Sequence, residues 1–395
     1  MGINKKYKPS PIGKIPIEWD AVLLSEICEI VRGSSPRPAG SPEFFNGDFI
    51  PWVTVSELTN LSEGQKHILK TETCLTKKGS MQSRVLEKGT LLLANSGATL
   101  GVPKILGIKA CANDGVAAFI NVNPEFSAEF LYYNLQGLTR YYREVVAPGN
   151  GQPNLNTTLI GETYIPKPPI KEQFKITEVL NTCDFAIEKL ITLISKKERL
   201  RRSMIKDLIS GEIRFKEFKN EKWKKRTIEE IAINKNSSLS LNNLEGNEGQ
   251  YNLYGATGLI KKINFYESDE RYIAIIKDGA GVGRSFICSE RSSIVGTMAY
   301  IKQNELSDLD FLFYLLQSIN FENYITGSTI PHIYFSSYSK LSLPIPSIKE
   351  QKKISSFLMN LDSEISKLKS QLDKLILQKK GLMQLLLKGK LRVKL

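Results

Sequence analysis

The sequence repeats itself, and this repeat constrains the fold more than any other feature. Residues 166–214 align without a gap with residues 344–392, and 17 of the 49 aligned positions are identical. The closest match is Pro-Lys-Pro-Pro-Ile-Lys-Glu-Gln at 166–173 against Pro-Ile-Pro-Ser-Ile-Lys-Glu-Gln at 344–351. Because self-similarity at a fixed shift indicates a duplicated structural unit, we expect two copies of one element in this chain.

The repeated segments are predicted to be long helices that pair with each other. Apolar residues recur at alternating spacings of three and four across 354–386, interrupted by Lys379, and across 176–208, interrupted by Lys197 and Arg201. Stripes of this length are typical of coiled coils, and two copies in one chain favour an intramolecular pair. A bundle core inside one large domain would give the same stripes, so this alternative stays open.

Proline and glycine mark the expected ends of these helices. Pro166, Pro168 and Pro169 block a helix upstream of the first copy, as Pro344 and Pro346 do for the second. Glycine follows each stripe at positions 211 and 389, where it is a suitable C-terminal stop.

The remaining residues predict two globular α+β units. Trp19 and Trp223 begin similarly spaced patterns and are expected to anchor the two cores. Short β-like runs are separated by turns, and the glycine turns at 96–101 and 278–283 each follow an apolar run. The predicted order is a first globular domain at 1–165, a central helical region at 166–214, a second globular domain at 215–343 and a C-terminal helical region at 344–395.

The composition favours a polyanionic partner and a reducing compartment. The net charge is +13, with 54 basic and 41 acidic residues, and the excess lies in the helical segments and their linker. Such a balance suggests nucleic acid, although lysines on a solvated coiled-coil face would also produce it. Five scattered cysteines and two histidines argue against a disulfide framework or a zinc site and favour the cytoplasm. No apolar run reaches the ~18 residues of a membrane span, and residues 1–10 show no secretory signal.

Two unlike globular units, each followed by a copy of one proline-led helical segment, resemble the specificity subunit of type I restriction–modification systems. The resemblance covers essentially the whole chain and is carried mainly by the Pro-x-Pro-x-Ile-Lys-Glu-Gln entries at 166–173 and 344–351. It implies two target recognition domains joined by two long helices that form an antiparallel coiled coil with pseudo-two-fold symmetry. Each domain is expected to read one half of a bipartite site in double-stranded DNA. Because the two domains differ in sequence, the site should be asymmetric.

The resemblance also implies partners and places the chemistry on them. The helices are expected to set the spacer between half-sites and to dock two modification (methyltransferase) subunits, and restriction (translocase/nuclease) subunits would complete the complex. S-adenosylmethionine, ATP and Mg²⁺ are expected on those partners, and no cofactor is expected on this chain.

Two other functions stay open. Gly279–Gly283 resembles the glycine loop of an S-adenosylmethionine site, which would make the chain a fused methyltransferase. However, the first copy has Thr99 where the second has Gly281, and the sequence contains neither an [Asn/Asp]-Pro-Pro-[Tyr/Phe] motif nor a Walker loop. A tight turn, or close approach of the backbone to a phosphate, is the favoured explanation of these glycines. The other alternative is a non-catalytic coiled-coil adaptor that binds proteins.

The candidate DNA-binding residues lie in the glycine turns and nearby polar loops. Arginine is a good bidentate reader of guanine, although an exposed loop arginine is often merely solvated. His332, whose counterpart in the repeat is Asn154, is suited to bond a base edge or a phosphate, or to cap a turn. The candidates are Arg32, Ser34, Arg37, Ser96, Thr99, Gln152, Asn154, Lys277, Arg284, Thr329 and His332. The candidate partner-binding residues are Lys196, Lys197, Arg201 and Arg202, and no catalytic or metal-binding residue is predicted.

Overall fold

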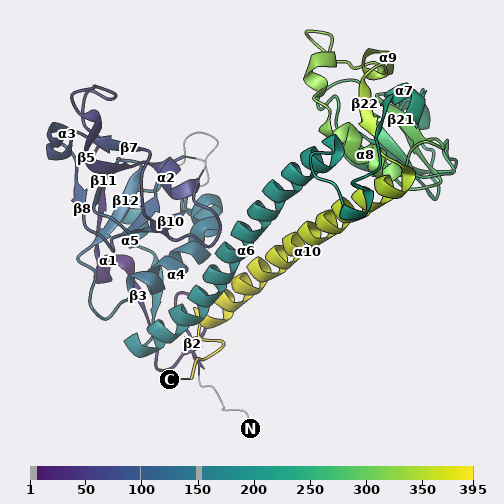
Figure 1. The fold of residues 1–395 in the computed structure, drawn as a ribbon. Helices are drawn as coiled ribbons and strands as arrows, with labels where there is room; N and C mark the ends of the chain where they lie inside the picture. Colours follow the sequence, from purple (N-terminus) through teal and green to yellow (C-terminus); the bar gives the residue numbers. More distant parts are fainter. Residues whose placement is uncertain (1–6, 98, 148–153, 395) are drawn as a thin grey trace. The chain divides into compact units, whose positions relative to one another are not determined.

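The computed structural model describes residues 7–97, 99–147 and 154–394, which form two compact units (Figure 1). Unit 1 comprises residues 1–193 and 369–395, and unit 2 comprises residues 194–368. Each unit therefore contains one globular part and a portion of each of the two long helices.

Unit 1 is built on two sheets. A five-stranded sheet has the order β4-β12-β9-β10-β6 and a four-stranded sheet the order β7-β5-β11-β8, while β3 pairs with β13 and β1 with β2. The strands are β1 Tyr7–Lys8, β2 Ile15–Pro16, β3 Asp20–Leu23, β4 Glu29–Arg32, β5 Phe45–Val53, β6 His67–Ile68, β7 Thr73–Leu75, β8 Val85–Leu86, β9 Leu91–Ala94, β10 Pro103–Leu106, β11 Ala110–Ala112, β12 Val116–Ile120 and β13 Tyr164–Lys167. The helices of its globular part are α1 Leu24–Ile27, α2 Val55–Thr59, α3 Lys77–Met81, α4 Ala128–Tyr141, the π-helix η1 Tyr142–Val146 and α5 Thr157–Gly161.

Unit 2 repeats this plan with fewer strands. Its main sheet has the order β15-β21-β18-β19, a smaller sheet has the order β17-β16-β20, and β14 pairs with β22. The strands are β14 Lys224–Thr227, β15 Ala232–Asn236, β16 Tyr251–Gly255, β17 Gly258–Ile263, β18 Tyr272–Ile276, β19 Ser285–Cys288, β20 Ser292–Ile294, β21 Met298–Gln303 and β22 Ser342–Ile345. The helices of its globular part are the 3₁₀ helices η2 Lys216–Phe218, η3 Asn242–Leu244 and η4 Phe321–Tyr324, with α7 Ile228–Ile231, α8 Leu309–Ser318 and α9 Phe335–Tyr338.

The two globular parts share one topology. The order β4-β12-β9-β10 in unit 1 corresponds to β15-β21-β18-β19 in unit 2, and all these neighbours are antiparallel. Strands β9 and β18 are buried along their whole length, which explains why their sequences are continuous apolar runs. Trp19 is fully buried in the unit 1 core and Trp223 packs half-buried against the unit 2 core. The predicted α+β duplication is confirmed.

The repeated segments are the two long helices α6 (Ile170–Ser210) and α10 (Ile348–Leu386). With 41 and 39 residues they span about 60 Å at ~1.5 Å per residue, longer than the ~33-residue stripes alone indicate. Each begins directly after its proline segment, and the glycines that follow, Gly211 and Gly389, adopt the positive φ angles of helix stops. Figure 1 shows the two helices side by side.

Their antiparallel pairing is evident inside each unit. In unit 1 the beginning of α6 (Ile176, Leu180) shares a core with the end of α10 (Met383, Leu386). In unit 2 the end of α6 shares a core with the beginning of α10, as Leu208 and Leu358 do. The predicted antiparallel pair is therefore confirmed, and each helix contributes to the core of both units.

Candidate nucleic-acid interface

In unit 2 the glycine turn after β18 lies against the segment that contains His332. Asp278 and His332 form an isolated antiparallel bridge, the amide of Ile333 donates to the carbonyl of Lys277 at 2.9 Å, and the amide of Gly279 donates to the carbonyl of Pro331 at 2.9 Å. Two stretches more than 50 residues apart in sequence thus form one surface.

The side chains on this surface form a linked polar group. Nδ1 of His332 lies 2.7 Å from Oδ1 of Asp278, and the ammonium group of Lys277 bonds to the other carboxylate oxygen. Partial burial acts to raise the pKa of Asp278, but the hydrogen bonds from His332 and Lys277 outweigh it and hold that pKa below its ordinary value. Asp278 is therefore a carboxylate at neutral pH.

The remaining turn residues are held by local contacts. Gly281 has a φ of +91°, and an added Cβ there would lie 2.2 Å from the Arg284 guanidinium, which therefore occupies this space. Arg284 and Thr329 are exposed. The side chain of Arg284 closes over the turn, so the glycines serve a compact turn here.

Unit 1 has the same backbone arrangement with different side chains. Ser96 and Asn154 form the isolated bridge, and the amide of Leu155 donates to the carbonyl of Asn95 at 2.7 Å. Thr99 lies half-buried in the same turn, whereas Gln152 lies outside the described residues. The repeat thus brings Ser96 and Asn154 together just as it brings Asp278 and His332 together.

The end of β4 and the loop after it contact Asp114. Arg32 donates two hydrogen bonds to the carbonyl of Asp114, at 3.0 and 2.7 Å, and Arg37 lies 3.9 Å from its carboxylate. The Ser35 hydroxyl donates to the Asp114 carboxylate, and this bond, opposed by partial burial, lowers the pKa of Asp114. Ser34 donates instead to the carbonyl of Gln82. Arg32 and Arg37 are therefore ordered around one acidic residue, whereas Ser34 is held by Gln82.

Sequence reasoning missed several polar residues beside these turns. In unit 2, Asn234 and Asn236 on β15 line a cavity of about 80 Å³ together with Lys277 and Tyr334. Asn236 lies 204 positions after Arg32, and the same shift relates Trp223 to Trp19. Extending the alignment of the two globular domains from these tryptophans would have identified Asn236 as the counterpart of Arg32. In unit 1 both polar atoms of the fully buried Asn95 amide lack a partner among the described residues.

The polar interruptions of the helical stripes form a cluster that recurs in both units. In unit 1 Lys379 on α10 pairs with Asp184 on α6 at 2.6 Å and donates to Gln136 on α4, and Tyr133 donates to Asp184 at 2.6 Å. In unit 2 the corresponding residues are Arg201, Asp362, Gln317 and Tyr314, with the same contacts. The interruptions thus join α6, α10 and the main helix of each globular part.

A second recurring cluster explains the Ile-Lys-Glu-Gln signature. The fully buried carboxylate of Glu172 accepts from Trp19 Nε1 at 2.9 Å and from two nitrogens of Arg392. In unit 2 Glu350 accepts from Trp223 at 2.8 Å and from Arg214 at 2.9 and 2.7 Å.

The adjacent glutamines of the signature bond to the loop before the main helix of each globular part. Gln173 bonds to Glu125 and Ser127, and Gln351 bonds to Leu306 and Asp308. The repeated motif therefore fastens each globular part to the helix that follows it.

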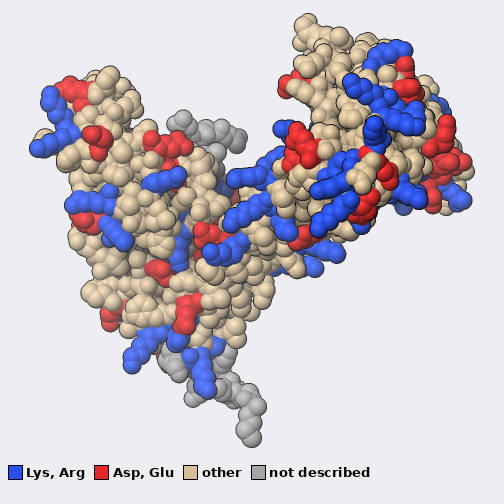
Figure 2. Space-filling model, in the orientation of Figure 1, with Lys and Arg blue, Asp and Glu red and all other residues tan. Residues whose placement is uncertain are grey.

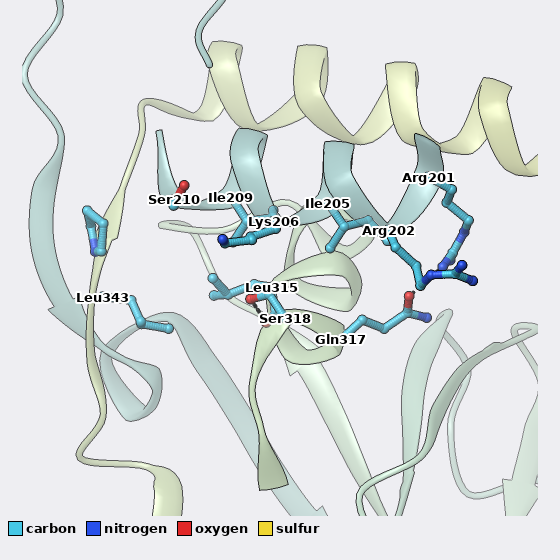
Figure 3. Close-up of a pocket in the computed structure, with 11 residues that line it drawn as sticks. Arg201, Arg202, Ile205, Lys206, Ile209, Ser210, Leu315, Gln317, Ser318 and Leu343 are labelled. Carbon is cyan, nitrogen blue, oxygen red and sulfur yellow. Dashed lines mark hydrogen bonds between the residues drawn. The ribbon is translucent and has the colours of Figure 1, made fainter. Parts of the chain in front are cut away.

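The four candidate partner-binding residues lie on α6 within unit 2. Lys197 pairs with Glu364 at 2.9 Å and Arg201 with Asp362, whereas Lys196 and Arg202 are exposed. Arg201 and Arg202 border a hollow of about 490 Å³ (Figure 3). Its floor is apolar, and the residues that line it are Arg201, Arg202, Ile205, Lys206, Ile209, Ser210, Leu315, Gln317, Ser318, Leu343 and Pro344. Basic side chains also gather where the long helices run (Figure 2).

The described part of the chain contains neither a membrane-spanning helix nor a cluster of metal ligands. Within residues 7–97, 99–147 and 154–394, none of the helices combines the length and the apolar composition that a membrane span requires. The same residues contain no group of three or more His, Cys, Asp or Glu side chains placed to hold a metal ion.

Two homologous globular parts, each with an equivalent turn surface and joined through a paired helix repeat, define a bipartite recognition protein. The chain belongs to the family of the type I restriction modification DNA specificity domain, whose model matches residues 16–196 and 220–378. DNA sequence specificity in a type I restriction–modification system is therefore its function.

Known proteins resemble this chain over nearly its full length. It is 26% identical to the type I restriction enzyme MjaIX specificity subunit of Methanocaldococcus jannaschii, covering 98% of this chain and 97% of that protein. It is 21% identical to the EcoprrI specificity subunit of Escherichia coli, covering 90% and 92%.

Solved structures support the fold. The S subunit of a type I restriction–modification system from M. genitalium aligns with a TM-score of 0.62 at 17% identity, covering 98% of this chain and 99% of that one. A chain from a structure concerned with complex assembly and conformational transition of the type I R-M system aligns with a TM-score of 0.57 at 16% identity, covering 96% and 100%.

Proposed function

We propose that each globular part reads one half of an asymmetric bipartite site in double-stranded DNA through its glycine-turn surface. The observation that carries this proposal is the duplicated bridge, Ser96 with Asn154 and Asp278 with His332, beside sheets that share one four-strand order. A shared backbone frame with unlike polar side chains is what two readers of different sequences require, because base identity is read by side-chain donors and acceptors.

The long helices set the spacer and dock the partners. A rigid pair of about 60 Å helices is long enough to impose a separation of one or more turns of DNA, ~34 Å each. The apolar hollow would receive an apolar side chain of a modification subunit. Arg202 and Lys206 at its border would pair with carboxylates that flank this side chain. Two modification subunits, one for each half of the repeat, and the restriction subunits would assemble on this frame.

The chain itself would be non-catalytic and cofactor-free. The Arg284 guanidinium fills the space beside Gly281. This supports the interpretation of Gly279–Gly283 as a tight turn and not as an S-adenosylmethionine-binding loop. We assign S-adenosylmethionine, ATP and Mg²⁺ to the partner subunits. A cytoplasmic location stays a prediction from the cysteine pattern.

A domain exchange tests the proposal. Residues 218–343 are replaced by the corresponding residues of a related subunit, the chain is expressed with its modification subunit, and methylated adenines are mapped across the genome. One half-site should change while the other half-site stays. A change in both half-sites, or binding that is indifferent to DNA sequence, would contradict the assignment and favour a protein-binding adaptor.

A further inference from the structure

The Asp278–His332 pair in unit 2 determines whether the free ring nitrogen of His332 donates or accepts a hydrogen bond. Asp278 is ionised at neutral pH, because hydrogen bonds hold its pKa below the ordinary value. An ionised carboxylate accepts hydrogen bonds and donates none, so the proton of the 2.7 Å contact is on Nδ1 of His332. In the neutral imidazole, Nε2 then carries a lone pair and acts as an acceptor.

The Nε2 edge of the ring is open. Nε2 of His332 has no hydrogen-bond partner among the described residues, and it is not a buried atom, so a ligand can reach it. The His332 side chain is 34% exposed. Position 327, next to this edge, is a glycine with a φ of +89°, and a Cβ there would lie 3.2 Å from Cδ2 of His332. The Ile330 carbonyl oxygen would lie closer still, at 2.4 Å, so the glycine is required by the turn and also leaves the ring edge clear. Tyr334 lies nearly parallel to the ring with a centroid separation of 6.5 Å.

We propose that His332, accepting a hydrogen bond at Nε2, reads an exocyclic amino group in the major groove, N6 of adenine or N4 of cytosine, in the half-site bound by unit 2. This proposal rests on the proposed DNA-reading role of the turn surface. Guanine and thymine present only acceptors at the corresponding edge, so an acceptor at Nε2 excludes them. Asp278 is a positioning residue, because it selects the tautomer, and Lys277 bonds to its second oxygen.

Protonation would invert this preference. His332 with both nitrogens protonated donates from Nε2 and favours guanine. The charged groups in contact with the pair are Asp278 itself and Lys277, whereas Arg284 is directed over Gly281. A phosphate contact would behave differently, because a phosphate accepts from protonated His332 whatever the base sequence.

The experiment uses the full chain with its modification subunit on duplexes carrying each of the four base pairs at every position of the unit 2 half-site. Wild-type protein should prefer adenine or cytosine over guanine by about tenfold at one position at pH 7.5. His332→Ala should abolish this preference at that position alone, and Asp278→Asn should weaken it by permitting the other tautomer. His67→Ala in unit 1 is the matched control and should leave the half-site unchanged.

The outcomes separate this proposal from the proposed function. If wild-type protein reads both half-sites and His332→Ala keeps every base preference of the unit 2 half-site, the His332 role is wrong and the function stands. Uniform weakening over all sequences would make His332 a phosphate contact and overturn base reading. If wild-type protein shows no sequence preference, the proposed function itself fails. Thermal unfolding of each variant verifies that it is folded.

Discussion

The carboxylate of Asp184 on α6 lies 2.6 Å from the ammonium group of Lys379 on α10, and both side chains are almost completely buried. Arg201 and Asp362 repeat this pair in unit 2, each exactly 178 positions from its counterpart. A buried ion pair permits one register of two apolar helices, since a slip by one turn would leave both charges unpaired. The buried interruption at Lys379 therefore fixes the register of the two helices, and the partly exposed Arg201–Asp362 pair repeats the same contact.

Removing the cation of this pair should destabilise unit 1 strongly. Lys379→Met keeps the length of the side chain but leaves Asp184 buried without its counter-ion, a change that costs about 3 kcal/mol. The thermal transition of unit 1 should fall by about 6–12 °C in calorimetry. Lys380→Met, at the exposed neighbouring position, is the matched control and should shift it little. Equal shifts for the two variants would show that the pair does not stabilise the helix register.

Neutralising Glu350, the glutamate of the second Ile-Lys-Glu-Gln motif, should also destabilise its unit. Glu350→Gln places a neutral amide in a fully buried position that accepts from Trp223 and Arg214, and it should cost unit 2 about 2 kcal/mol. Denaturant unfolding followed by tryptophan fluorescence measures this loss. Glu217→Gln removes a half-exposed pair with Lys353 and should cost much less, because solvent screens the two charges. A similar loss for Glu217→Gln would refute a special role of the motif.

The free energy of unfolding of unit 1 should be higher in mild alkali than at neutral pH because of Lys104. Burial lowers its pKa from 10.5 to about 8. The folded protein then releases this proton at a lower pH than the unfolded chain does, so stability increases between pH 8 and 10.5, by at most about 3 kcal/mol.

A lysine variant isolates this effect. Wild-type protein should gain stability relative to Lys104→Met as the pH rises from about 7.5 to about 10, which thermal unfolding at a series of pH values measures. Lys109→Met, at an exposed position, should keep a constant difference from wild type. Parallel curves for wild type and Lys104→Met would mean that Lys104 is charged throughout the range.

Local signals account for what the sequence predicts well. The repeat, the apolar stripes and the stops at Gly211 and Gly389 are features of neighbouring residues, and they predicted the helix pair and the α+β duplication. The partner of Lys379 is 195 positions away, so no local pattern reveals that the interruption is paired. The link between Asp278 and His332 likewise depends on a long-range bridge, although the repeat singled out both segments.

The recognition surface was predicted only in part for a related reason. Asn236 and Asn95 lie at strand ends where the two copies differ in sequence, so the repeat gives no strong match there. Their position became apparent from strand order, which pairs β4 with β12 and β15 with β21. Which side chains contact bases depends on the DNA, and the DNA-binding candidates therefore stay predictions.

The length of the helix pair should determine the DNA spacer. Seven residues inserted after Leu190 in α6 and seven after Leu368 in α10 preserve the heptad phase of both stripes. Both insertions fall between the positions of the recurring ion pairs, so each pair keeps its own partners. Seven residues lengthen each helix by ~10 Å, which corresponds to about three base pairs at ~3.4 Å each.

Methylation mapping of cells that carry the lengthened chain gives the measurement. Both half-sites should be retained and the spacer should grow by about three base pairs, since the recognition surfaces are untouched. Insertion into α6 alone is the matched control: it brings the Asp184–Lys379 and Arg201–Asp362 pairs out of mutual register and should reduce methylation at every site. An unchanged spacer in the double insertion would mean that the helices do not measure the distance between half-sites, because a rigid pair cannot lengthen without moving the units it joins.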